Sequence, residues 1–198
     1  GPAGSGKSTS ARRVAETLRY TYLDTGAMYR AITLAVLEKG VSIHTEEVAP
    51  LLEHISIRVM PSASGQRTFL GDRDVSERIR ESDVTANVSA VSAIPEVRRR
   101  LVTIQQEIGR AGGIVMDGRD IGTVVFPNAE LKIFLIASIE ERARRRMIES
   151  SELTDRDPSE VARELQERDH KDSTREVSPL VKAPDAVEID TSHCTIDE

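Results

Sequence analysis

Residues 1–8 read GPAGSGKS and fit the pattern G-x-x-x-x-G-K-[ST] from the first position of the chain. Glycines let such a loop fold tightly, so that successive backbone N–H groups can point at phosphate oxygens. In this pattern Lys7 reaches the terminal phosphates of a nucleotide, and the hydroxyl of Ser8 binds Mg²⁺. The apolar residues of 10–19 recur at helical spacing, which supplies the helix that should follow. The stretch predicts a phosphate cradle formed by Gly1, Pro2, Ala3, Gly4, Ser5, Gly6, Lys7, Ser8 and Thr9.

A strand normally precedes a cradle of this kind, and none stands before Gly1 in the sequence. We therefore expect the sequence to begin inside a longer protein whose first strand lies outside it.

The composition narrows the class of protein. A length of 198 residues suits one domain with a proper core, and the net charge of −6 disfavours nucleic acid and anionic membranes as partners. Cys194 is the one cysteine, and the sequence contains no apolar run of about 18 residues, so we expect a reducing, cytoplasmic setting. The four histidines show no ligand spacing, and no structural metal is predicted.

Strand patterns alternate with helix patterns along most of the chain. Strands are predicted at residues 20–24, 114–117, 131–136 and 186–190, and helices at residues 26–39, 95–112, 138–148 and 158–171. This alternation predicts an α/β fold, with a parallel sheet covered by helices on both faces. Ligands gather at the carboxyl ends of such strands, where Asp24, Asp117 and Asp190 stand.

Residues 41–82 interrupt this alternation. The segments 55–59 and 68–70 alternate with a period of two, as the strands of a half-buried antiparallel sheet do, and residues 74–75 continue the pattern beyond a turn at 71–72. We expect a small antiparallel insert here.

Arginines stand where a phosphoryl-transfer enzyme needs them. Such transfer requires alignment of donor and acceptor, and positive charge around the transferred group. Arg30 and Arg119 follow strand ends, and further arginines stand at 142–146, 156, 168 and 175. The pattern favours an enzyme that brings two anionic substrates together.

Six blocks in order identify a resemblance. The chain resembles the bacterial cytidylate kinases, a family of nucleoside monophosphate kinases, in the blocks GPAGSGKST (1–9), LDTGAMYRA (23–31), SAVSAIPEVR (89–98), MDGRDIGTVVFP (116–127), KIFLIAS (132–138) and ERDHKDSTR (167–175). The resemblance implies one P-loop kinase core over 1–198, a monophosphate-binding insert at 41–82, a lid at about 142–158, and a last helix beyond Glu198. It also implies transfer of a phosphoryl group from ATP to CMP or dCMP with Mg²⁺, by a monomer.

The family's site residues carry over by position. The resemblance assigns catalysis to Lys7, Arg119 and Arg175, and the CMP phosphate to Arg119, Arg168 and Arg175. It assigns the ribose-phosphate side of CMP to Thr25 and Arg30, although the family more often has serine at the position of Thr25. It assigns the cytosine edge to Ser89, Arg98 and Asp120, and the sugar hydroxyls to Asp172.

Other interpretations stay open. The arginines and carboxylates could form ordinary surface ion pairs, and Ser89 could serve only helix packing. A P-loop kinase for another small acceptor, such as UMP or shikimate, would carry a similar cradle. A GTPase-like switch is a further alternative, although the sequence lacks the N-K-x-D pattern that reads guanine.

Overall fold

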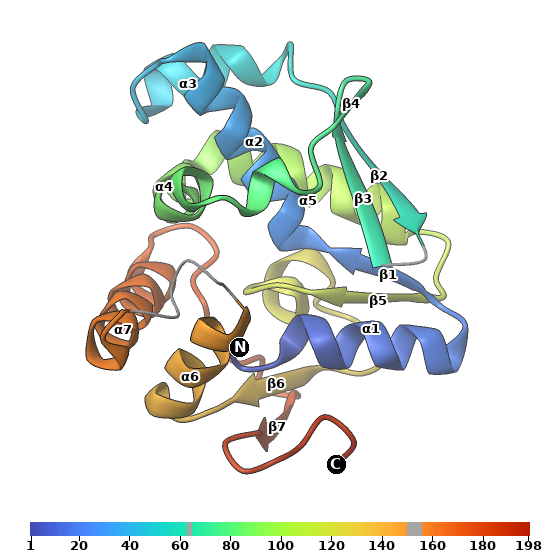
Figure 1. The fold of residues 1–198 in the computed structure, drawn as a ribbon. Coiled ribbons are helices and arrows are strands. Elements are labelled where there is room, and N and C mark those ends of the chain that lie inside the picture. The colour runs from blue at the N-terminus through green and yellow to red at the C-terminus, as the bar shows by residue number, and fades with distance from the viewer. Residues whose placement is uncertain (63–64, 150–155) are drawn as a thin grey trace. The chain divides into compact units, whose positions relative to one another are not determined.

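The computed structural model describes residues 1–62, 65–149 and 156–198 (Figure 1). The chain divides into two compact units. We call Gly1–Ser10 with Arg119–Glu198 the cradle unit, and Ala11–Gly118 the insert unit. The part of the predicted lid at 150–155 lies outside the described residues, as do residues 63–64.

The insert unit contains a parallel pair of strands. β1 (Thr21–Asp24) pairs with β5 (Ile114–Asp117), in a register that sets Asp24 opposite Asp117. α2 (Thr25–Lys39) begins directly after β1, because the carboxylate of Asp24 accepts the N–H of Ala27 at 3.0 Å. α2 ends at Gly40, whose φ of 65° is the left-handed conformation typical of a helix terminus. These predicted elements are confirmed.

The predicted antiparallel insert is present. β2 (Ile57–Ser62) pairs with β3 (Gly65–Leu70), and β3 pairs with the short β4 (Arg73–Asp74). The structure adds two helical segments that the sequence did not indicate: α3 (Thr45–Leu52) and a 3₁₀ turn, η1 (Arg78–Arg80). The side-chain amide of Gln66 in β3 bonds both backbone groups of Asp24, at 2.9 and 3.3 Å, and so joins the insert to the end of β1.

Helices enclose the apolar core of the insert unit. α4 (Ser82–Ala93) and α5 (Pro95–Gly109) pack with α2, and Pro95 stands at the first turn of α5, where its missing N–H is tolerated. The core is aliphatic, with members such as Met28, Ile32 and Leu101 almost fully buried.

The cradle unit has its own parallel pair. β6 (Ile133–Ile136) pairs with β7 (Val187–Asp190), so the parallel strands expected of an α/β fold are found in both units. α6 (Ile139–Glu149) and α7 (Pro158–Thr174) lie side by side (Figure 1). A π-helical turn, η2 (Ile121–Val125), follows Asp120.

Side-chain caps explain where α6 and α7 start. Asp157 accepts the N–H of Ser159 at 2.8 Å, and Ser138 accepts the N–H of Glu141 at 3.2 Å. The carboxylate of Glu141 binds Arg144 and Arg145, at 2.7 Å each. Among the described residues, no helix is both long and apolar enough to cross a membrane.

Candidate active site

The cradle loop has the backbone that its glycines permit. Gly4 and Gly6 take φ angles of 75° and 83°, a region that side chains rarely allow. α1 (Lys7–Leu18) starts at the end of the loop, and the N–H of Ser10 donates to the carbonyl of Gly6 at 3.0 Å. The loop therefore leads into the N-terminus of a helix, which favours bound anions.

The polar side chains of the loop have different exposures. Ser5 is fully buried, and its hydroxyl donates to the carbonyl of Pro2 at 3.0 Å. The ammonium of Lys7 donates to the same carbonyl and lies 3.4 Å from the hydroxyl of Ser5. Ser8 and Thr9 are exposed in the first turn of α1. Mg²⁺ keeps several waters and shares substrate phosphates, so one accessible hydroxyl at the cradle suits its needs.

Three sequence-predicted arginines gather in the cradle unit. The Nε of Arg119 donates to Asp172 at 2.9 Å. The guanidinium of Arg175 lies 3.7 Å from Asp172 and 3.9 Å from Asp120, and its Nε donates to the carbonyl of Ser178 at 2.6 Å. We call Arg119, Asp120, Arg168, Asp172 and Arg175 the cationic cluster.

Arg168 reveals the electrostatic state of this cluster. Burial, followed by the positive charge of Arg119, lowers the pKa of Arg168 to about 10, and Asp172 opposes the shift. The cluster has three guanidinium groups and two carboxylates, and beside it Arg146 of α6 adds repulsion at Arg168 while Asp169 adds attraction. A site with surplus positive charge in a poorly hydrated place suits a phosphate group.

Four sequence-predicted residues lie in the insert unit, two of them on α2. Thr25 is buried, and its hydroxyl donates to the carbonyl of Asp117 at 2.7 Å. Arg30 donates to the hydroxyl of Thr85 in α4 at 2.8 Å and to the carbonyl of Ile79 at 3.3 Å. These bonds hold Arg30 between α2 and α4.

The other two stand on α4 and α5. Arg98 is 2% exposed, lies 5.1 Å from the ring centre of Tyr29, and donates to the carbonyl of Ser92 at 3.1 Å. Ser89 is half-buried, and its carbonyl accepts the hydroxyl of Ser92 at 3.0 Å. The cation–π contact and the backbone bond fix the Arg98 guanidinium among the helices of this unit.

The paired strand ends carry a cation that sequence reasoning missed. Arg80 of η1 bonds the carboxylate of Asp24 at 2.6 Å, and the hydroxyl of Tyr22 donates to Asp117 at 3.2 Å. Burial lowers the pKa of Arg80, but Asp24, Tyr22 and Asp117 outweigh it, and the pKa lies above its ordinary value. The sequence did not indicate the role of Arg80, because its contact with Asp24 joins residues 56 positions apart.

The arginines of the predicted lid do not act alike. Arg144 pairs with Glu141 on the surface of α6, and Arg145 also reaches the hydroxyl of Thr191 at 2.9 Å. Arg142 is buried beneath the cradle rather than displayed on the helix surface. Arg156 pairs with Glu164 at 2.6 Å.

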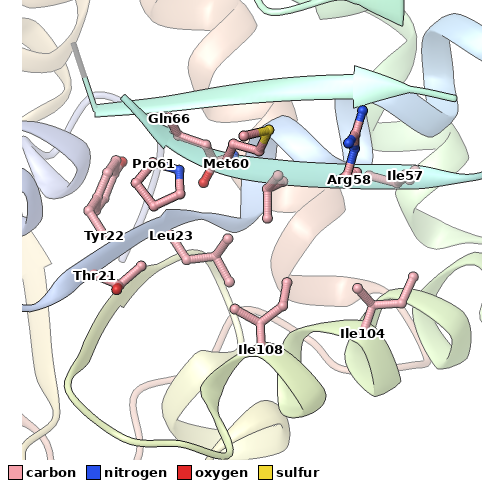
Figure 2. Close-up of a pocket in the computed structure, with 11 residues that line it drawn as sticks. Thr21, Tyr22, Leu23, Ile57, Arg58, Met60, Pro61, Gln66, Ile104 and Ile108 are labelled. Atoms are coloured by element: carbon pink, nitrogen blue, oxygen red, sulfur yellow. The ribbon is translucent and has the colours of Figure 1, made fainter. Parts of the chain in front are cut away.

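A pocket of about 240 Å³ in the insert unit lacks the chemistry of a phosphate site. It lies between β1, β2 and α5, and Figure 2 shows Leu23, Ile57, Ile104 and Ile108 among its lining residues. Its arginine, Arg58, packs over the ring of Phe69 at 5.0 Å. The cradle and the cationic cluster remain the candidate active site, and among the described residues no group of three or more His, Cys, Asp or Glu side chains could hold a metal.

Known proteins resemble this chain along its whole length. The family model described as cytidylate kinase matches residues 1–198. A cytidylate kinase of Enterococcus faecalis is 54% identical over 201 residues, which cover 100% of this chain and 88% of that protein. A cytidylate kinase of Streptococcus gordonii is 55% identical over 201 residues, which cover 100% of this chain and 89% of that protein. A cytidylate kinase of Anoxybacillus flavithermus is 52% identical over 200 residues, which also cover 100% of this chain and 89% of that protein. The chain belongs to the cytidylate kinase family.

Proposed function

We propose that this chain transfers the terminal phosphoryl group of ATP to CMP, and also to dCMP, to form the diphosphate. The observation that carries the proposal is the surplus positive charge of the cationic cluster in the same unit as a phosphate cradle. Family membership and the names of the relatives support CMP as the acceptor.

The arginines do the work that this reaction asks of a protein. Phosphoryl transfer needs positioning and charge stabilisation rather than covalent help. Arg119, Arg168 and Arg175 screen the repulsion between the acceptor phosphate and the donor. No general base is needed, since the attacking phosphate oxygen is already ionised near neutral pH. Lys7 stabilises the charge on the transferring group.

Residues of the cradle hold the donor. The backbone of Gly1–Thr9 and the ammonium of Lys7 bind the phosphates of ATP, and Ser8 contributes a hydroxyl to Mg²⁺. When bound there, Mg²⁺ would supply positive charge to the phosphates.

Further residues recognise the acceptor. We assign the ribose-phosphate side to Thr25 and Arg30, and the sugar hydroxyls to Asp172. Ser89, Arg98 and Asp120 read the base. Cytosine offers an amino donor and two acceptors, whereas uracil presents an acceptor in place of the amino group, so a carboxylate together with an arginine can reject uracil. We also propose that the chain acts as a monomer in the cytoplasm, and light scattering on the purified chain tests the first point.

A coupled assay of ADP release tests the proposed reaction. Turnover is compared for CMP, dCMP, UMP, AMP and shikimate at equal concentration, with Mg²⁺ and ATP present. CMP and dCMP should give the highest kcat/KM. Equal rates on CMP and UMP would contradict the role given to Arg98 and Asp120, and turnover of shikimate alone would refute the nucleotide acceptor.

A further inference from the structure

The third residue of the cradle is held by two side chains from α6 and α7. The N–H of Ala3 donates to the carboxylate of Asp169 at 3.1 Å, and the carbonyl of Ala3 accepts from Arg142 at 3.2 Å. Arg142 and Asp169 also pair with each other. The Nε of Arg142 donates to the carbonyl of Ala137 at 3.1 Å, beyond the end of β6. We call Ala3, Arg142 and Asp169 the cradle brace.

The brace contains a largely buried ion pair, an arrangement whose attraction alone adds little net stability. The side chains of Arg142 and Asp169 are 10% and 18% exposed. Desolvation of two charges offsets most of their attraction, and apolar replacements of similar volume are often neutral or stabilising. What the charged pair adds is direction, since a donor and an acceptor fix both polar groups of Ala3.

Close packing transmits the position of Arg142 to the next residue of the loop. A Cβ on Gly4 would lie 3.1 Å from the Cβ of Arg142 and 3.1 Å from its carbonyl oxygen. Gly4 also has a φ of 75°. The loop therefore rests directly on α6 and has little room to move.

The brace also links the cradle to the cationic cluster. Asp169 follows Arg168 in α7 and precedes Asp172 by three residues, so one helix bears a cradle contact and two members of the cluster. We propose that Asp169 and Arg142 are positioning residues. They orient the peptide groups of the cradle for the donor phosphates and fix the position of the cradle relative to Arg168 of α7. This inference rests on the proposed function for its substrates.

The substitution Asp169→Asn tests the brace in the full chain. It keeps an oxygen acceptor for Ala3 but removes the charge that pairs with Arg142. We expect the Kd for Mg-ATP, measured calorimetrically without acceptor, to rise about 10-fold or more, because cradle N–H groups that no longer point at the phosphates lose hydrogen bonds worth about 1.5–3 kcal/mol each. The affinity for CMP should stay at the wild-type value.

Glu167→Gln is the matched control. It removes the same charge from the same helix, two residues away, at an exposed position. Its Mg-ATP affinity should equal that of the wild type. Equal loss in both variants would overturn the proposal, because a general charge effect would then explain the result.

A double substitution separates positioning from folding. Arg142→Met with Asp169→Leu replaces the buried ion pair by an apolar one, which offsets part of the cost of leaving the N–H and carbonyl of Ala3 without these partners, so the variant should still show a cooperative thermal transition. We expect Mg-ATP affinity to stay low in this folded variant. Recovery of wild-type affinity would overturn the proposal, as it would show that the brace only fills space.

The binding measurement distinguishes this proposal from the proposed reaction. A wild-type chain that binds Mg-ATP but does not phosphorylate CMP would refute CMP as the acceptor. The Mg-ATP affinity of Asp169→Asn would still test the positioning role of the cradle brace. Wild-type Mg-ATP affinity in Asp169→Asn would overturn the brace and leave transfer to CMP intact. A wild-type chain that fails to bind Mg-ATP would overturn both.

Discussion

The interiors of the two units differ in chemistry. The insert unit is built around large aliphatic clusters, to which α2, α3, α4 and α5 all contribute. The apolar cluster of the cradle unit is small, namely Ala3, Ala143, Val161 and Leu165, and the same unit buries Asp120, Arg142 and Asp172. The insert unit also buries the charged side chains of Asp24, Arg30, Arg98 and Asp117, so the contrast lies in its much larger aliphatic core.

This contrast separates stability from chemistry. Burial of one large aliphatic side chain stabilises a fold by roughly 1.5–3 kcal/mol, whereas buried ion pairs contribute little net stability. The charged interior of the cradle unit therefore adds little stability, and it suits the phosphate binding proposed for this unit. Substitutions in the cradle unit should therefore reduce activity more than stability, and core substitutions in the insert unit should reduce stability more than activity.

The largest expected effect is on catalysis, in the cradle unit. Lys7→Ala should reduce kcat by about 10²–10³ or more, because it removes a positive group from the transferring phosphate. Circular dichroism should show unchanged helical content. Turnover close to the wild-type rate would contradict the role of Lys7.

A core substitution in the insert unit should show the opposite profile. Leu52 is 5% exposed in α3, a helix without site residues. Leu52→Ala should lower the free energy of unfolding by about 2–5 kcal/mol, measured by urea denaturation. The kcat per folded molecule should not change. A large loss of kcat in fully folded protein would contradict the assignment of stability to the insert unit and chemistry to the cradle unit.

Arg168→Met should raise the stability of the chain and weaken its use of CMP. Because burial and Arg119 lower the pKa of Arg168, its charge opposes folding at neutral pH, and that opposition fades as the pH rises through about 10. The variant should melt at a higher temperature without ligand, yet its KM for CMP should rise about 10-fold or more. Arg163→Met, on an exposed face of the same helix, is the control that should alter neither property.

The smallest expected effect concerns acid stability at α6. Hydrogen bonding by Arg144, followed by Arg145, lowers the pKa of Glu141 from its ordinary value of 4.5 to about 2. The ionised carboxylate therefore stabilises the fold above pH 4.5, and this contribution is lost as the pH falls from 4.5 towards 2. The melting temperature of Glu141→Gln should depend less on pH in this window, and an identical acid profile in both proteins would refute the assignment.

Local signals predicted most of the elements. The caps at Asp157 and Gly40, the proline at position 95 and the apolar runs at 114–117 and 133–136 act through neighbours in the sequence, so they can be read there. α3 escaped prediction because it is short and contains Pro50, which interrupts the usual helical pattern.

The contacts of the candidate site were harder to predict from the sequence. The pattern of residues 1–9 indicated the cradle, and spacing marked Arg119, Arg168 and Arg175 as candidates. The bond between Ala3 and Asp169 spans 166 positions, and nothing in the sequence distinguishes Asp169 from a solvated helix carboxylate. Arg142 belongs to a run of arginines whose other members lie at least partly exposed, so only packing shows that it points inward.

The surplus charge around Arg168 has a consequence for the lifetime of the chain in a cell. A ligand that binds the native state alone shifts the folding equilibrium by mass action, and an anionic nucleotide bound at the cluster as proposed would do so by relieving repulsion among guanidinium groups. When nucleotides are abundant, fewer molecules open and become cleavable by proteases. Starvation for substrate should shorten the half-life of the protein, so that its abundance follows demand without a dedicated regulator.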